Sequence, residues 1–159
     1  MEMINAIKAL FKPMHNPIQA WYWNRRYEYY RQKYPFINSE AWFNGYGIII
    51  NGNGYLEIEP KSKLSGGSQI KICEGTRIQI GAHCMILQNV HMKTWKYNRD
   101  DYNILEYGNI KIGSYCYIGY GTVIEPGVTI GHHVHIMPNS YIDEDIPAGA
   151  IVKSNMIIK

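Results

Sequence analysis

The stretch IGSYCYIGYGTVIEPGVTIGHHVHIMPNSYI, residues 112–142, repeats every six residues. Isoleucine occupies each step of this period, at positions 112, 118, 124, 130, 136 and 142. An α-helix repeats near 3.6 residues and a simple strand repeats at two, so neither element alone explains the pattern. The period therefore points to a structure in which short strands recur at a fixed longer interval.

The residues two positions before each isoleucine are also apolar or small: Ile110, Cys116, Thr122, Val128, Val134 and Ser140. Each unit thus has two inward side chains that flank one outward side chain, after which the chain turns. Glycine follows the isoleucine at Gly113, Gly119 and Gly131, where the backbone must bend without interference from a Cβ atom. Short strands joined by tight corners around one axis are typical of a parallel β-helix, with neighbouring coils about 4.8 Å apart.

The period continues upstream with interruptions. Ile58, Leu64 and Ile70 are six residues apart, and a slip of four before Ile80 predicts a shortened corner or a bulge. A gap of twenty residues follows Met92, and the polar, aromatic segment inside it predicts an excursion loop over residues 93–109. We assign residues 45–159 to the β-helix domain.

Residues 1–44 lack the period and predict a helical N-terminal cap. The aromatic and arginine-rich segment PIQAWYWNRRYEYYRQKYPF predicts a helix that opens at Pro17 and ends before Pro35. A helix over the end of the coil stack would cover its exposed strand edges, which is the favoured interpretation. The alternative is contact with a membrane surface or a glycan through residues 18–34.

The bulk composition indicates one globular domain: 159 residues, 46% hydrophobic and 18% charged. Residues 1–35 hold six basic and two acidic side chains, a charge of +4, whereas the rest of the chain sums to −1 and brings the net charge to +3. No basic face extends beyond this segment, so we expect no nucleic-acid partner. Three cysteines without CxxC spacing, no long apolar run and no secretion signal favour a reducing, cytoplasmic location.

Two motifs resemble the hexapeptide-repeat acyltransferases, the left-handed parallel β-helix group: IKIGSYCYIGYGTVIEPGVTIG and the closing segment DEDIPAGAIVKSN. Within that group, galactoside, maltose and capsular-sugar O-acetyltransferases are the most similar, over roughly residues 50–155. The resemblance implies a triangular coil of left hand, against the usual right-handed crossover rule. It also implies a homotrimer with active sites between subunits. The implied reaction is acetyl-CoA-dependent acetylation of a sugar hydroxyl, in capsule, exopolysaccharide or O-antigen assembly.

The family's catalytic histidine lies near a threonine of the excursion region. In VHMKTWKYNRDD, Thr94 matches that threonine and Tyr97 stands at the expected histidine position. His91 is the nearest substitute, because Val90 and Met92 are inward by phase and His91 must point outward. We predict His91 as the base, with Asp100 or Asp101 available to orient it. Trp95 and Tyr97 suit stacking on a sugar ring.

The resemblance also assigns the cofactor contacts. Carried over by position, the backbone near Tyr120, Gly121, Pro138 and Asn139 would contact acetyl-CoA. Lys153 could supply a positive charge, and Asn155 remains from the closing motif that packs the adenine. Asp143 and Glu144 stand where the family often has Thr-Lys, which would repel a phosphate.

Two other functions stay open. The missing loop histidine and the lost Thr-Lys favour a catalytically inactive binding or scaffold trimer. The GHHVH cluster (His132, His133 and His135, with His83 at a matching phase) invites comparison with γ-class carbonic anhydrases, which bind zinc through three histidines. Its spacing is too tight for that ligand set, so we expect no metal. Cys84 and Cys116 occupy inward positions and are expected in the core, whereas Cys73 lies outside the strict phase.

Overall fold

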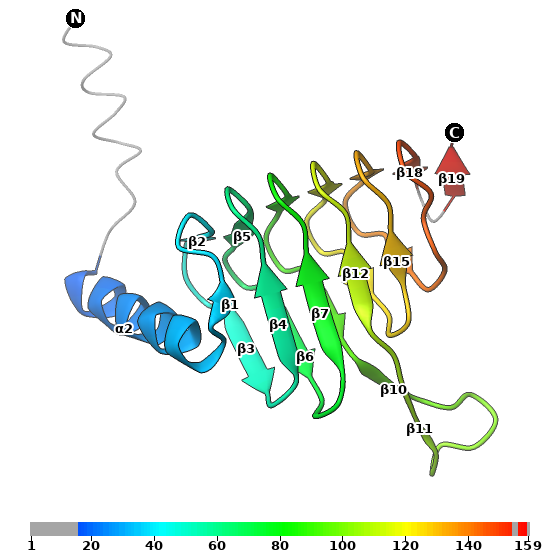
Figure 1. Cartoon of the computed structure of the whole chain (residues 1–159), viewed down its shortest axis with the longest axis horizontal. Helices are drawn as coiled ribbons and strands as arrows, with labels where there is room; N and C mark the ends of the chain where they lie inside the picture. Colours follow the sequence, from blue (N-terminus) through cyan, green and yellow to red (C-terminus); the bar gives the residue numbers. More distant parts are fainter. Residues whose placement is uncertain (1–15, 154–155, 159) are drawn as a thin grey trace, which may run out of the picture.

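The protein is a parallel β-helix, seen in a computed structural model that describes residues 16–153 and 156–158. Three parallel sheets wrap one axis, and each coil contributes one strand to each sheet (Figure 1). Strands on the near face run upward and the chain then crosses the top to the far face as it advances, so the coils are left-handed (Figure 1). The predicted all-β, left-handed β-helix with a helical cap is confirmed.

The strands of the three sheets are as follows. Sheet A contains β1 (Phe36–Ile37), β4 (Tyr55–Ile58), β7 (Arg77–Ile80), β12 (Ile110–Ile112) and β15 (Thr129–Ile130). Sheet B contains β2 (Trp42–Asn44), β5 (Lys63–Ser65), β8 (Met85–Ile86), β13 (Tyr117–Ile118), β16 (His135–Ile136), β18 (Ile151–Lys153) and β19 (Met156–Ile158). Sheet C contains β3 (Ile49–Gly52), β6 (Gln69–Ile72), β9 (His91–Lys93), β14 (Val123–Ile124) and β17 (Tyr141–Ile142).

The isoleucines of the period form the inner ladders. Ile112 pairs with Ile130 in sheet A, and the corresponding pairs in sheets B and C are Ile118 with Ile136 and Ile124 with Ile142. Every predicted inward position from residue 110 to 142 is buried, with at most 2% of the side chain exposed. Each ladder step joins residues eighteen apart, so six-residue sides close a three-sided coil.

The corner glycines have a reason that differs from the predicted one. Gly119 does not adopt a left-handed backbone; instead, a Cβ atom there would lie 2.4 Å from the backbone nitrogen of Pro138 in the next coil. The left-handed residue stands three positions after each isoleucine, as at Tyr115 (φ 60°) and His133 (φ 57°). The glycine is therefore required by close stacking of coils, and the bend itself is made two residues later.

All departures from the six-residue step beyond Ile58 occur at one corner, between sheets C and A. Ile70 and Ile80 are ten residues apart because β6 and β7 are four residues long and a turn separates them. The slip therefore reflects a lengthened corner, and the predicted shortened corner or bulge is wrong. The same corner carries the hairpin of β10 (Trp95–Tyr97) and β11 (Leu105–Tyr107), which projects from the solenoid inside residues 93–109 (Figure 1).

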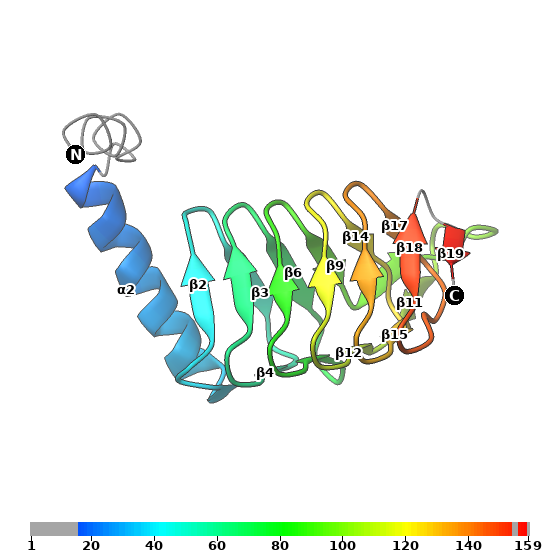
Figure 2. The same ribbon diagram turned by 90° about the horizontal axis from the view of Figure 1, so that it is seen from above.

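Helix α2 (Pro17–Lys33) covers the first coil (Figure 2). The side chain of Asn16 caps its N-terminus by accepting hydrogen bonds from the backbone N–H groups of Ile18 and Gln19, at 3.0 and 3.4 Å. Tyrosine hydroxyls from one helix face donate to backbone carbonyls of the coil edge: Tyr27 to Gly45 (2.6 Å), Tyr30 to Ile48 (3.2 Å) and Tyr34 to Gly52 (2.8 Å). The helix thus satisfies acceptors that an open solenoid end would leave unpaired.

The solenoid begins at β1, which pairs with β4, and so the first coil starts before the expected boundary at residue 45. Pro35 and the turn after Ile37 interrupt the period there and hide it in the sequence. Of the expected cap, residues 1–15 lie outside the described residues. At the other end, β19 pairs antiparallel with β18 and covers that edge of sheet B.

The outer face of α2 leaves Ile18, Trp21 and Tyr22 exposed, and contact of residues 18–34 with a membrane surface stays a prediction. Within the described part of the chain, α2 is too short and too polar to traverse a bilayer.

Candidate active site

His91 lies on the outer face of sheet C, in the third coil. Its neighbours in the sheet are Gln69 of β6 and Val123 of β14, and the flanking Val90 and Met92 are buried in the core. This outward position matches the alternation predicted from the sequence. A small pocket of about 160 Å³ opens beside the imidazole, lined by Gln69, Lys71, His91, Met92, Lys93 and Val123.

Two lysines and one carboxylate set the electrostatics of this pocket. Lys71 and Lys93 are register partners on β6 and β9, so their side chains emerge next to each other. The ammonium of Lys93 lies 3.6 Å from the carboxylate of Glu125, which is 4% exposed, and 5.6 Å from the ring centre of Trp95. Because Glu125 compensates Lys93, the charge of Lys71 leaves the pocket positive overall.

Tyr141 of β17 extends the charged group around Glu125. Burial, followed by the charge and hydrogen bonding of Glu125, raises the pKa of the Tyr141 phenol above its ordinary value. The phenol therefore stays protonated at neutral pH. It can donate a hydrogen bond but cannot serve as a base there.

The hairpin carries the predicted substrate residues. Trp95 and Tyr97 lie on β10 with their rings edge to face, 5.7 Å between centres. Asp100 and Asp101 lie in the turn, where both backbone N–H groups donate to Asn98 Oδ1 and the Asp101 carboxylate accepts from Asn103. No hydrogen bond joins either carboxylate to His91 in residues 16–153, so orientation of His91 by Asp100 or Asp101 stays a prediction.

The predicted cofactor residues gather at the opposite edge of sheet C, at its corner with sheet B. Tyr120 and Gly121 form this corner in one coil, and Pro138 and Asn139 form it in the next. Asn139 N–H donates to the Tyr120 carbonyl at 2.8 Å. Lys153 ends β18 one coil further along, in line with the same corner. Asn155 lies outside the described residues.

His91 therefore lies between the predicted substrate residues on the hairpin and the predicted cofactor residues at the corner of sheets B and C. The corner at Gln88–Asn89, next in line with Tyr120–Gly121, leads directly into β9. The hairpin with Trp95 and Tyr97 leaves the other end of β9.

The GHHVH histidines make contacts of other kinds. His132 Nδ1 accepts a hydrogen bond from Ser114 N–H at 2.9 Å, and His133 stacks on Tyr115 with 5.0 Å between ring centres. His135 packs against Tyr117 at 4.4 Å. Among the described residues, no three His, Cys, Asp or Glu side chains are grouped so as to hold a metal ion.

The cysteines follow the expected phase. Cys84 and Cys116 are buried in adjacent coils and Cys73 is half-buried. A hydrogen bond with Cys116, together with burial, raises the pKa of the Cys84 thiol. Cys84 is therefore a protonated core thiol rather than a nucleophile.

Sequence reasoning missed Glu125 and Lys71 as parts of this pocket. Glu125 had a signal, because it is the one acidic residue between positions 113 and 142. No feature of the sequence singled out Lys71, since exposed lysines are common on β-helix faces. Only the register of β6 against β9 places it beside His91.

Comparison with known proteins agrees with this architecture. Residues 109–144 match the family described as "Bacterial transferase hexapeptide (six repeats)". Residues 109–144 thus carry hexapeptide repeats of the bacterial transferase type. The chain is 32% identical over 79 residues to "Putative acetyltransferase YvoF" of Bacillus subtilis (strain 168), a match that covers 50% of this chain and 44% of the relative.

Solved structures share the fold. The hexapeptide-repeat acetyltransferase VCA0836 of Vibrio cholerae O1 biovar eltor, complexed with acetyl coenzyme A, has a TM-score of 0.69 at 20% identity, over 86% of this chain and 76% of that one. A maltose O-acetyltransferase of Clostridium difficile 630 has a TM-score of 0.62 at 22% identity, over 99% and 84%. A galactoside acetyltransferase in complex with coenzyme A has a TM-score of 0.64 at 20% identity, over 86% and 70%. At these identities the likeness establishes the fold.

Proposed function

We propose that this hexapeptide-repeat protein is an acetyl-CoA-dependent O-acetyltransferase. Its acceptor is a sugar hydroxyl in the assembly of a capsule, exopolysaccharide or O-antigen, and it works in the cytoplasm as a homotrimer. Support comes from its hexapeptide repeats and from relatives and structural neighbours named as acetyltransferases, two of them for maltose and galactoside. Neighbours complexed with acetyl coenzyme A or coenzyme A support the donor.

The observation that carries the proposal is the exposed imidazole of His91 inside a positively charged pocket, at the root of the hairpin. A neutral imidazole can accept a proton from an alcohol near neutral pH. Hydrogen-bond donors or cations in the pocket would stabilise the negative charge that develops during acyl transfer. Lys71 is the cation best suited to this role, because Lys93 is already paired with Glu125.

In the proposed reaction, His91 removes the proton from the acceptor hydroxyl as its oxygen attacks the thioester carbonyl. A C–O bond forms and a tetrahedral oxyanion results. The C–S bond then breaks, and His91 returns the proton to the departing thiolate of coenzyme A. Trp95 and Tyr97 would offer ring faces to the acceptor sugar. The corner of Tyr120, Gly121, Pro138 and Asn139 would contact the donor, with Lys153 near its phosphates.

A second candidate rests on Tyr97, which stands at the family's expected histidine position and is 53% exposed on the hairpin. If His91 cannot replace that base, the protein is a binding or scaffold trimer without catalysis.

Calorimetry with acetyl-CoA, followed by an assay of coenzyme A release with a panel of sugars, tests the proposal. We expect binding, and we expect His91→Ala to lower kcat/KM by about 100-fold or more while acetyl-CoA binding is kept. His135→Ala is the matched control, since this exposed histidine lies on sheet B. Light scattering measures the molar mass and so tests whether the protein is a trimer.

Three outcomes would decide against parts of the proposal. If acetyl-CoA does not bind at millimolar concentration, the proposed transferase function is ruled out. Unchanged turnover in His91→Ala removes His91 as base. Binding without turnover on any sugar favours the scaffold.

A further inference from the structure

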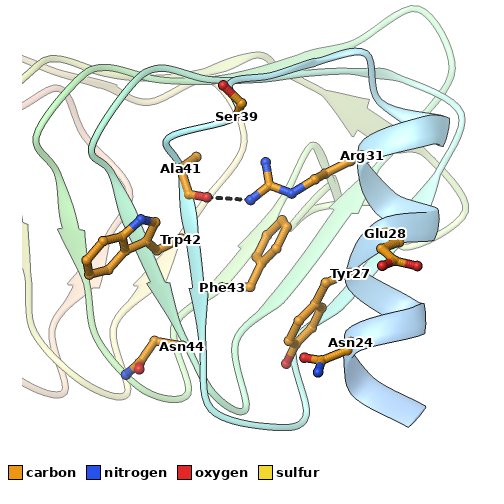
Figure 3. Close-up of a pocket in the computed structure, with 9 residues that line it drawn as sticks. All are labelled: Asn24, Tyr27, Glu28, Arg31, Ser39, Ala41, Trp42, Phe43 and Asn44. Atoms are coloured by element: carbon orange, nitrogen blue, oxygen red, sulfur yellow. Dashed lines mark hydrogen bonds between the residues drawn. The ribbon is translucent and has the colours of Figure 1, made fainter. Parts of the chain in front are cut away.

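A second cleft, remote from His91, lies between helix α2 and strand β2 (Figure 3). Its volume is about 410 Å³, larger than the pocket beside His91. Strand β2 belongs to the first coil and to sheet B, whereas His91 belongs to the third coil and to sheet C. The cleft therefore needs a role of its own.

Two walls of the cleft are held in place by hydrogen bonds to the coil. Arg31 donates from Nη1 to the Asn38 carbonyl at 2.8 Å and from Nη2 to the Ala41 carbonyl (Figure 3). Tyr27 is fixed by its bond to the Gly45 carbonyl, and its ring packs against Phe43 with 5.0 Å between centres. The cleft is thus formed before any ligand arrives, so binding would cost little ordering entropy.

Other lining groups are free to bind a ligand. The ring of Trp42 is 67% exposed and lies at the rim of the cleft, on the side of β2 away from α2 (Figure 3). In residues 16–153, the side chains of Asn24, Glu28 and Asn44 have no hydrogen-bond partner. Strand β2 is also an edge of sheet B, and Trp42 N–H already donates to Ser62 of the neighbouring coil. Since successive N–H groups of a strand alternate in direction, that of Phe43 faces the cleft side.

This combination matches the chemistry of a short chain of sugar rings. A pyranose offers a C–H face that packs on an exposed aromatic ring, and hydroxyls that both donate and accept hydrogen bonds. Amides and a carboxylate can satisfy those hydroxyls in both directions. The carboxylate of Glu28 would repel an anionic sugar, and the Arg31 guanidinium is turned toward backbone carbonyls. The chemistry therefore favours an uncharged sugar.

We propose that the cleft between α2 and β2 is a non-catalytic binding site for a neutral oligosaccharide, one unit of which stacks on Trp42 at the rim while another is hydrogen-bonded by Asn24 and Glu28 of α2. The site is independent of acetyl transfer. If the protein does acetylate a glycan, the cleft would hold a sugar unit of the same polymer away from His91.

Calorimetry tests this site. The full chain is titrated with maltotriose, lactose and chitobiose, each up to about 10 mM, in the absence of acetyl-CoA. We expect at least one saccharide to bind with a Kd of about 1 mM, as for one small stacked ligand. Trp42→Ala should weaken that binding about tenfold or abolish it. Trp21→Ala is the matched control, because this equally exposed tryptophan lies on α2 outside the cleft and should leave binding unchanged.

Glu28→Ala provides a second variant. This substitution should weaken saccharide binding several-fold, since one hydrogen-bonding group is lost. Circular dichroism establishes that each variant is folded.

The outcomes separate this site from the proposed transferase. Loss of saccharide binding in Trp42→Ala but not in His91→Ala supports the cleft, whether or not acetyl transfer is found. Loss in His91→Ala but not in Trp42→Ala places the sugar at the transferase pocket and overturns the cleft. Absence of binding by all three saccharides to the unaltered protein also overturns it.

Discussion

The ammonium of Lys93 lies 3.6 Å from the carboxylate of Glu125, and that carboxylate is almost completely buried. The two residues come from adjacent coils of sheet C, where the hairpin leaves the solenoid. A buried carboxylate that loses its counter-charge is destabilising, whereas an exposed ion pair contributes little. The pair therefore fixes the base of the hairpin next to His91.

Lys93→Met should lower the free energy of unfolding by about 1–3 kcal/mol, less than for a fully buried pair because Lys93 is partly exposed. Arg99→Ala, which removes the exposed pair between Arg99 and Asp143, should change it by less than about 0.5 kcal/mol. Urea denaturation measures both. Equal effects of the two substitutions would contradict the role given to burial.

The isoleucine ladder should dominate stability. Ile130→Ala removes a side chain that is 1% exposed and leaves a cavity, so we expect a loss of about 2–5 kcal/mol in the free energy of unfolding. Thr129→Ala, at the exposed neighbour in the same strand, should cost less than about 0.5 kcal/mol. The same denaturation assay applies, and a small effect at Ile130 would argue against an inner ladder.

Thr122 occupies an inward position, and its hydroxyl has no hydrogen-bond partner among the described residues. Valine has nearly the same shape without the polar group. Thr122→Val should therefore raise the free energy of unfolding by about 1 kcal/mol, measured as a higher midpoint in urea at unchanged slope. Destabilisation would indicate that the hydroxyl is satisfied by water.

Two glycines should respond differently to alanine. At Gly119 the added Cβ would meet the backbone of Pro138 in the next coil, so the coils must separate. At Gly127 the surroundings are open, and only the left-handed backbone (φ 93°) opposes alanine. We expect Gly127→Ala to cost about 1–2 kcal/mol and Gly119→Ala to cost more, as judged by thermal unfolding. The reverse order would show that conformation outweighs stacking.

Alkaline pH should weaken the cap. Burial raises the pKa of Tyr27 and of Tyr34 from 10.0 to about 12. The folded chain thus holds these phenolic protons more tightly than the unfolded chain. The stability that they contribute is complete below pH 10 and is lost as the pH rises through about 12.

Denaturation between pH 8 and about 12 should show this loss. The Tyr27→Phe, Tyr34→Phe double variant should show a smaller loss across the same range. At neutral pH that variant should be less stable by about 1 kcal/mol per hydroxyl removed, because two carbonyls lose their donors. An unchanged pH profile in the variant would assign the alkaline loss to other groups.

The sequence could specify the coil because inward and outward positions alternate locally. Ile118 and Cys116 are buried wherever a strand of this phase is wrapped into a coil, and no distant contact is needed to determine that. The same local logic placed His91 outside, between Val90 and Met92. It could not place the lengthened corner after Ile70, since Ile72 and Ile78 continue the inward–outward alternation through the longer strands there.

Groups that face outward are different, because their surroundings depend on which segments cover them. The burial of Glu125, the position of Lys71 beside His91 and the cleft between Trp42 and α2 all arise from contacts between segments far apart in the chain. The sequence by itself determined the repeat and its inner lining, since these follow from side-chain periodicity, and it determined the helical cap through Pro17 and Pro35, which bound α2. Only the tertiary structure decided which polar side chains share a pocket, because sheet register and the packing of α2 are set by the whole coil stack.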